Sequence, residues 1–150
     1  MKHSQNSVNS FFVEIIIVIL FFTISVSVTL QLFVAANNRA QQSSDLSTAV
    51  VKSEDIAEQV NGLSSADAIP KVLERATRTV SGGVEHYRLA FDRQWNEVQS
   101  DPRYVIDIAL NKTLSAGGTL VNTDITVTNT TGGEKPVYTL NSAKYLPKSS

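Results

Sequence analysis

The feature that most constrains this chain is an apolar run from Phe11 to Ala36, FFVEIIIVILFFTISVSVTLQLFVAA, which contains one charged residue, Glu14. A helix crosses a bilayer with about 20 apolar residues, each adding about 1.5 Å. An acid at bilayer depth costs about 2.5–3.5 kcal/mol on insertion scales and suggests a function. The alternative is that Glu14 lies near the interface and stays hydrated or protonated. We predict a transmembrane helix over residues 11–36.

The residues around this run favour a cytoplasmic N-terminus. Lys2 and His3 precede it without an acid, and positive residues concentrate on the cytoplasmic side of membrane helices. The alternative is a cleaved secretory signal, since Val34-Ala35-Ala36 has small residues where signal peptidase needs them. However, the run exceeds the usual signal core of about 7–15 residues and carries an acid. We therefore expect a single-pass anchor, with the residues after about Arg39 outside the cytoplasm.

The composition excludes several kinds of chemistry. The chain has no cysteine, which rules out disulfides, thiol catalysis and cysteine-based zinc sites. Thirteen basic and fourteen acidic residues give a net charge of -1, without a block of like charge. A nucleic acid is therefore not an expected partner. We expect no cofactor and no metal.

The pattern after the apolar run changes to that of an amphipathic helix over residues 37–62. Its apolar residues recur mostly at steps of three or four, as in a helix with one packed face: Leu46, Ala49, Val50, Ile56, Ala57 and Val60. No glycine or proline interrupts the chain between Phe11 and Asn61, and Gly62 is typical of a helix end. We predict one continuous helix whose second half packs on a domain.

The pattern of residues 63–147 predicts a connector followed by a sheet. Residues 63–83 are predicted to hold a short helix that starts near Pro70 and ends before Gly82-Gly83. From residue 84 to 147 the apolar period changes to two, in four short runs separated by turn residues. The strictest alternation places on one face Tyr104, Ile106, Ile108 and Leu110. We predict an α+β fold in which the long helix covers a small antiparallel four-stranded sheet through this face.

Residues with catalytic potential form no recognisable site. The acids Asp92, Glu97 and Asp101 lie around Trp95, but they do not form a calcium-binding loop, and we interpret them as turn residues. No nucleophile elbow, P-loop or dinucleotide fingerprint occurs. Trp95 is interpreted as folding over its hairpin, with a surface contact as the alternative. We predict no enzymatic activity.

The order of these features resembles a type IV pilin or pseudopilin, of the small pilin-like type found in Gram-positive bacteria. The likeness rests on SFFVEIIIVILFF after a leader-like N-terminus at residues 1–10, on the amphipathic continuation, and on the hairpin pattern YxLxFDxxW. The resemblance implies that a membrane peptidase removes the leader. It also implies that a glutamate at the fifth mature position neutralises the terminal amine of a neighbouring subunit. The matching residues here are Phe11, Phe12 and Glu14.

The leader departs from the family pattern, because Asn9 or Ser10 stands where glycine is usual before the cleavage point. Cleavage after Asn9 makes Glu14 the fifth mature residue and Ser10 the first. Cleavage after Ser10 makes Phe11 the first residue and Glu14 the fourth. The helix also lacks the proline and glycine that often kink the stalk of such proteins.

The resemblance implies a structural role. The chain would be a minor pilin or pseudopilin of a type IV pilus or a type II secretion-like filament. Its partners would be other pilin-like subunits, a membrane assembly platform and lipid, and its domain would lie outside the cell. The alternative is a stand-alone anchored domain that binds a surface ligand through its sheet or the Trp95 hairpin. Dependence of assembly on Glu14 separates the two.

Overall fold

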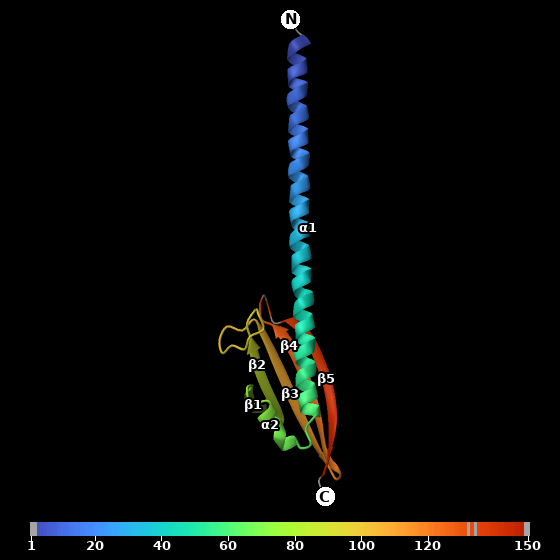
Figure 1. Cartoon of the computed structure of the whole chain (residues 1–150), viewed down its shortest axis with the longest axis vertical. Coiled ribbons are helices and arrows are strands. Elements are labelled where there is room, and N and C mark those ends of the chain that lie inside the picture. The colour runs from blue at the N-terminus through green and yellow to red at the C-terminus, as the bar shows by residue number, and fades with distance from the viewer. Residues whose placement is uncertain (1–2, 132, 134, 149–150) are drawn as a thin grey trace. The chain divides into compact units, whose positions relative to one another are not determined.

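The computed structural model describes residues 3–131, 133 and 135–148, with the side chains of residues 3–9 left out of the description. The first element, α1 (His3–Asn61), is a single α-helix (Figure 1). The chain divides into two compact units, Met1–Ser44 and Asp45–Ser150. The part of α1 up to Ser44 forms the first unit, and the rest of α1 belongs to the second.

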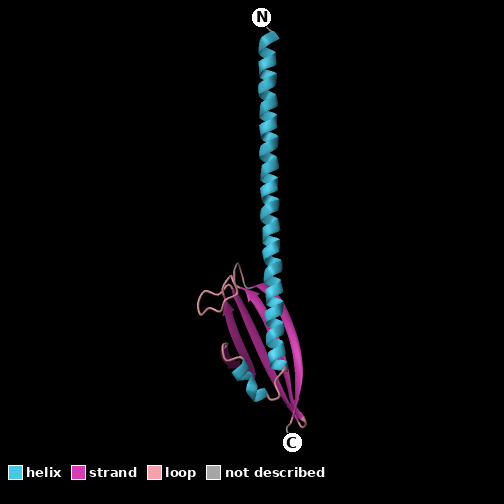
Figure 2. Ribbon diagram, viewed as in Figure 1, coloured by secondary structure: helices cyan, strands magenta, loops and turns pink. Residues whose placement is uncertain are grey.

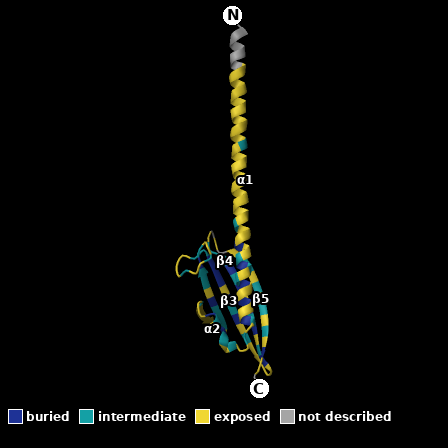
Figure 3. Ribbon diagram, in the orientation of Figure 1, coloured by how far each residue is buried: buried dark blue, intermediate teal, exposed yellow. Residues whose placement is uncertain are grey.

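The first unit exposes its apolar side chains. The large apolar residues between Phe11 and Val34 are all exposed, and Figure 3 shows this stretch as exposed almost throughout. By length and composition this helix is able to cross a membrane. The hydroxyls of Thr23, Ser25, Ser27 and Thr29 each donate to the carbonyl oxygen four residues earlier, at 2.8 Å. These bonds satisfy the hydroxyls within the helix, as a lipid environment requires.

The second unit combines the end of α1 with a five-stranded antiparallel sheet (Figure 2). After α1 come a 3₁₀ turn, η1 (Ala66–Ala68), and a single helical turn, α2 (Ile69–Val72). The strands are β1 (Thr77–Ser81), β2 (Val84–Phe91), β3 (Tyr104–Ser115), β4 (Gly118–Asn129) and β5 (Lys135–Pro147). Their spatial order equals their order in the chain, so the sheet is a simple meander.

The core lies between the sheet and the last turns of α1. The predicted buried face is confirmed, since Tyr104, Ile106, Ile108 and Leu110 have no exposed surface. They share one cluster with four residues of α1, namely Ala49, Ile56, Ala57 and Val60. Asp107, on the opposite face of β3, is exposed. The sheet therefore has one apolar face under the helix and one polar face, as is usual for antiparallel sheets.

Small residues form part of the buried face of α1. Ala49, Ser53 and Ala57 follow at steps of four, so they lie on one face of the helix, and all three are buried. At the end of α1, the Asn61 side-chain amide donates to Ser142 Oγ at 2.8 Å, and Lys144 Nζ donates to the Asn61 carbonyl oxygen. These bonds join the C-terminus of the helix to β5.

The prediction of four strands was wrong, because residues 77–81 form an additional strand, β1, instead of the end of a helix. The helix α2 ends at Val72, and the sheet begins at Thr77 rather than at Val84. The glycines Gly82 and Gly83 have φ angles of 59° and 84° and connect β1 directly to β2. Two central residues with positive φ are typical of the tight turn in a two-residue hairpin. The glycines therefore join two strands and do not end a helix.

Candidate functional site

The candidate assembly residues lie near the start of the exposed apolar run of α1. Phe11 and Phe12 are 60% and 57% exposed, and their ring centroids are 6.4 Å apart in an edge-on arrangement. Glu14 is exposed on the same stretch of helix. Among the residues that the structure describes, no ion pair involves Glu14. The site therefore presents one carboxyl group within an apolar helix surface.

The two possible cleavage positions both lie within α1. Ser10 is exposed, whereas the side chain of Asn9 lies outside the described residues, as does the whole of Lys2. The helix passes through both positions without a change of conformation. The choice between cleavage after Asn9 and cleavage after Ser10 therefore stays a prediction.

The loop between β2 and β3 holds Trp95 against the domain. The Asp92 carboxylate accepts hydrogen bonds from the backbone N–H groups of Gln94 and Asn96, at 2.8 and 2.9 Å, and from the Asn96 side chain. The bonds from Asn96 are the main cause of a pKa of Asp92 below its usual value. Asp92 thus acts as a turn residue, as the sequence indicated. Its bonds fix the two residues that flank Trp95.

Trp95 stacks on a neighbouring aromatic ring. Its ring lies parallel to that of Tyr104, with a centroid distance of 4.2 Å and an interplanar angle of 3°, and its centroid is 5.9 Å from that of Phe91. The residue has a φ of 63°, which is unusual for a bulky side chain. One face of the half-buried indole is occupied by Tyr104, so this geometry supports the interpretation that Trp95 folds over its own hairpin.

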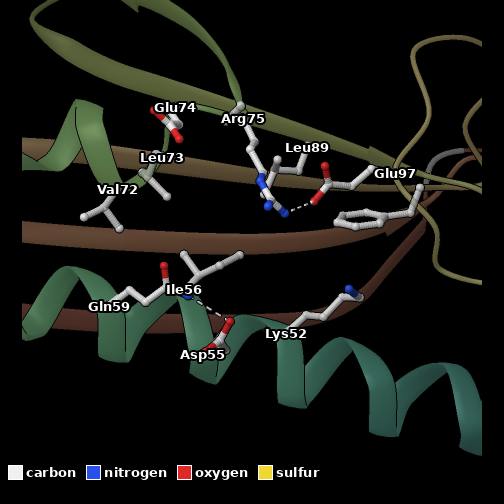
Figure 4. A pocket seen from close by; sticks show the side chains of 12 residues that line it. Lys52, Asp55, Ile56, Gln59, Val72, Leu73, Glu74, Arg75, Leu89 and Glu97 are labelled. Atoms are coloured by element: carbon white, nitrogen blue, oxygen red, sulfur yellow. Dashed lines mark hydrogen bonds and ion pairs between the residues drawn. The ribbon is translucent and has the colours of Figure 1, made fainter.

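A groove of about 400 Å³ lies between α1, the segment after α2, and the loop that follows β2 (Figure 4). Its apolar lining comes from residues that include Ile56, Leu73, Leu89 and Phe91. Three of its charged residues, Lys52, Arg75 and Glu97, interact with one another or with an aromatic ring, and Asp55 accepts a hydrogen bond from the Gln59 side chain. Arg75 pairs with Glu97 at 3.4 Å, and Lys52 Nζ lies 4.5 Å from the centre of the Phe91 ring. These contacts leave no convergent set of polar groups directed at a ligand.

Glu85, which the sequence did not indicate, interacts with side chains of three strands. Its carboxylate accepts hydrogen bonds from Lys112 Nζ at 2.5 Å and the Tyr87 hydroxyl at 2.8 Å, and pairs with Arg78 at 3.2 Å. Partial burial acts to raise the pKa of Glu85, but the bonds from Lys112 and Tyr87 and the charges of Lys112 and Arg78 bring it below its usual value. Burial and the bond to Glu85 raise the pKa of Tyr87 to about 12. These residues stabilise one another across strands β1, β2 and β3.

Comparisons with known proteins do not assign the chain to a family. No protein-family model, no curated protein and no solved structure matches it. Within the described residues, no group of three or more histidine, aspartate and glutamate side chains is arranged to hold a metal ion. A functional assignment therefore rests on the physical character of α1 and of the domain.

Proposed function

We propose that the chain is a membrane-anchored structural subunit, a minor pilin or pseudopilin, of a type IV pilus or a type II secretion-like filament. The observation that carries this proposal is the exposed apolar stretch of α1, which contains Glu14 and continues into a helix that packs on a sheet. Such a surface is unfavourable in water and needs lipid or the helices of other subunits to cover it. The helix is the assembly element, and the small domain is the part that other molecules meet.

The proposed role of Glu14 is to pair with a cation on a neighbouring subunit. That cation is a freed N-terminal amine or, if the leader is retained, Lys2. In a medium of low dielectric the attraction between opposite charges is strong, and an unpaired charge is costly. A carboxylate that is neutralised only by a neighbour therefore favours association of helices over an isolated helix in lipid. Phe11 and Phe12 would supply apolar contacts beside this pair.

The proposed topology has a cytoplasmic N-terminus and an extracellular domain, because Lys2 and His3 precede the span. Protease added to intact protoplasts should remove the domain and leave a membrane-embedded fragment. Protection of the domain would contradict this topology. A free domain in the medium that begins at Asn37 would instead support the cleaved signal.

The decisive experiment compares wild type with Glu14→Ala and Glu14→Gln at matched expression. Association is measured by crosslinking in membranes and by co-purification with the other pilin-like proteins of the host. We expect both variants to insert at least as well as wild type, because the cost of burying the acid is gone, and to lose association. Glutamine should fail like alanine, since the proposed role needs the charge.

A matched control is Gln31→Ala, which removes a polar side chain from the same apolar run without changing charge. It should insert and associate like wild type. Unchanged association in both Glu14 variants would overturn the assembly proposal. The chain would then be better described as a stand-alone anchored binding domain.

A further inference from the structure

One segment of α1 lies between parts of the helix that are stabilised in different ways. Residues 37–44, Asn-Asn-Arg-Ala-Gln-Gln-Ser-Ser, follow the apolar run and end where the second compact unit begins, at Asp45. We call them the tether segment. Gln41 is half-buried, and the other side chains of the segment are exposed. The segment is helical in the structure, but it belongs neither to the apolar run nor to the packed core.

Four of the eight residues of the tether segment, two asparagines and two serines, disfavour a helix in water, whereas its arginine, its alanine and its two glutamines favour one. Asparagine and serine rank well below alanine in helix propensity, because their side chains compete for backbone hydrogen bonds. Most helical stability in proteins comes from packing of an apolar face, and the tether segment has no large apolar side chain. The flanking parts differ. Lipid would stabilise the apolar run, and the core holds α1 from Ala49 onward.

We propose that the tether segment is a reversible hinge, in which the helix unfolds locally while both flanking parts remain helical. This inference rests on the proposed membrane anchor. Eight residues span about 12 Å as a helix and up to about 27 Å when extended. Local unfolding therefore lets the domain turn freely and reach roughly 15 Å further from its anchor, without loss of core packing or of the span.

Hydrogen exchange of the full-length chain in bilayer nanodiscs tests the proposal. Amides of residues 38–44 should exchange at least about 100-fold faster than those of residues 52–60, because they need only local opening. Amides of residues 15–34 should be protected by the bilayer. Equal protection of the tether segment and of residues 52–60 would overturn the hinge.

A substitution series tests the cause of the exchange. Replacing Asn37, Asn38 and Ser43 by alanine favours the helix about 2.5-fold at each position, so exchange in the tether segment should slow roughly 15-fold. The control, Ser47→Ala, changes an exposed serine of α1 in the second unit and should leave the tether segment unchanged. An unchanged rate in the triple variant would overturn the proposal, since exchange would not depend on helix propensity.

A distance measurement gives a second readout. The chain has no cysteine, so Val34→Cys and Ser47→Cys carry two spin labels without other changes. A fully helical tether holds them in a narrow distribution near 20 Å, whereas the hinge gives a broad distribution that narrows in the alanine triple variant. The bilayer protection of residues 15–34 reports on the anchor separately. Loss of that protection would contradict the proposed function, and a protected span with a rigid tether would contradict the hinge alone.

Discussion

Ser53 offers a direct test of how α1 packs on the sheet. Its side chain has no exposed surface, and its hydroxyl oxygen has no hydrogen-bond partner among the described residues. A buried hydroxyl without a partner costs about 1–3 kcal/mol. Alanine removes this cost and adds about 0.5 kcal/mol of helix propensity. The van der Waals contacts of one oxygen atom are lost, roughly 0.5–1 kcal/mol.

We therefore expect Ser53→Ala to raise the free energy of unfolding of the domain by about 1.5 kcal/mol. At about 4–8 °C for each kcal/mol, the melting temperature should rise by roughly 6–12 °C. The assay is thermal unfolding of the full chain in detergent micelles, followed by the fluorescence of Trp95. Because Trp95 is the only tryptophan in the sequence and lies in the domain, the signal reports domain unfolding.

The control for this experiment is Ser47→Ala, an exposed position on the same helix. It should gain only the propensity term, about 0.5 kcal/mol. The reasoning is refuted if Ser53→Ala melts at the same temperature as wild type or below it. A hydroxyl that contributes to stability would then have a partner in solution, such as a trapped water molecule.

Three further changes test the rest of the domain. Ile106→Asp places an unpaired charge in the core and should lower the free energy of unfolding of the domain by at least about 4 kcal/mol. Asp107→Asn, on the exposed face of the same strand, should leave it unchanged. Equal melting curves for the two variants would contradict the face assignment. Because the folded pKa of Glu85 is lowered, its stabilisation is present above its unfolded pKa and is lost as pH falls through the folded value. Glu85→Gln should therefore flatten the acid side of a plot of stability against pH, and an unchanged slope would argue against the network. Gly83→Val should weaken the hairpin of β1 and β2, because the φ of Gly83 is 84°, which a valine rarely adopts. The β1 amides should then exchange their hydrogens faster than in wild type. Unchanged protection of these amides would contradict the turn assignment.

The sequence was sufficient to predict the elements that have a strong period. The helix followed from the apolar run, the later amphipathic stripe and the absence of breakers before Gly62. Strands β2 to β4 followed from their alternation, which is strictest from Tyr104 to Leu110, and β5 was predicted from a poorer alternation. Strand β1 was missed because five residues are too few for a clear period. Its β-branched Thr77, Thr79 and Val80, placed directly before two glycines, were a usable hairpin signal.

The ion pairs of Glu85 were not predictable in the same way. Glu85 lies opposite Leu110 in the register of β2 and β3, so Lys112 reaches it only along the diagonal. That register depends on the path of the loop over residues 92–103, including the positive φ of Trp95. The pattern of apolar residues fixes which face a side chain lies on, but it does not fix which charges become neighbours.

The order of the strands has a consequence for the time course of folding. Each strand pairs with the strand that precedes it in the chain, so pairing closes only short loops, and such topologies fold comparatively fast. A chain that leaves a ribosome or a translocation channel with its N-terminus first would add each new strand to an edge that is already formed. The packed part of α1 is made before any strand, and its apolar face stays uncovered until the sheet grows beneath it. We expect β5 to dock last, so that the edge of β4 stays open to other chains until Pro147 has emerged.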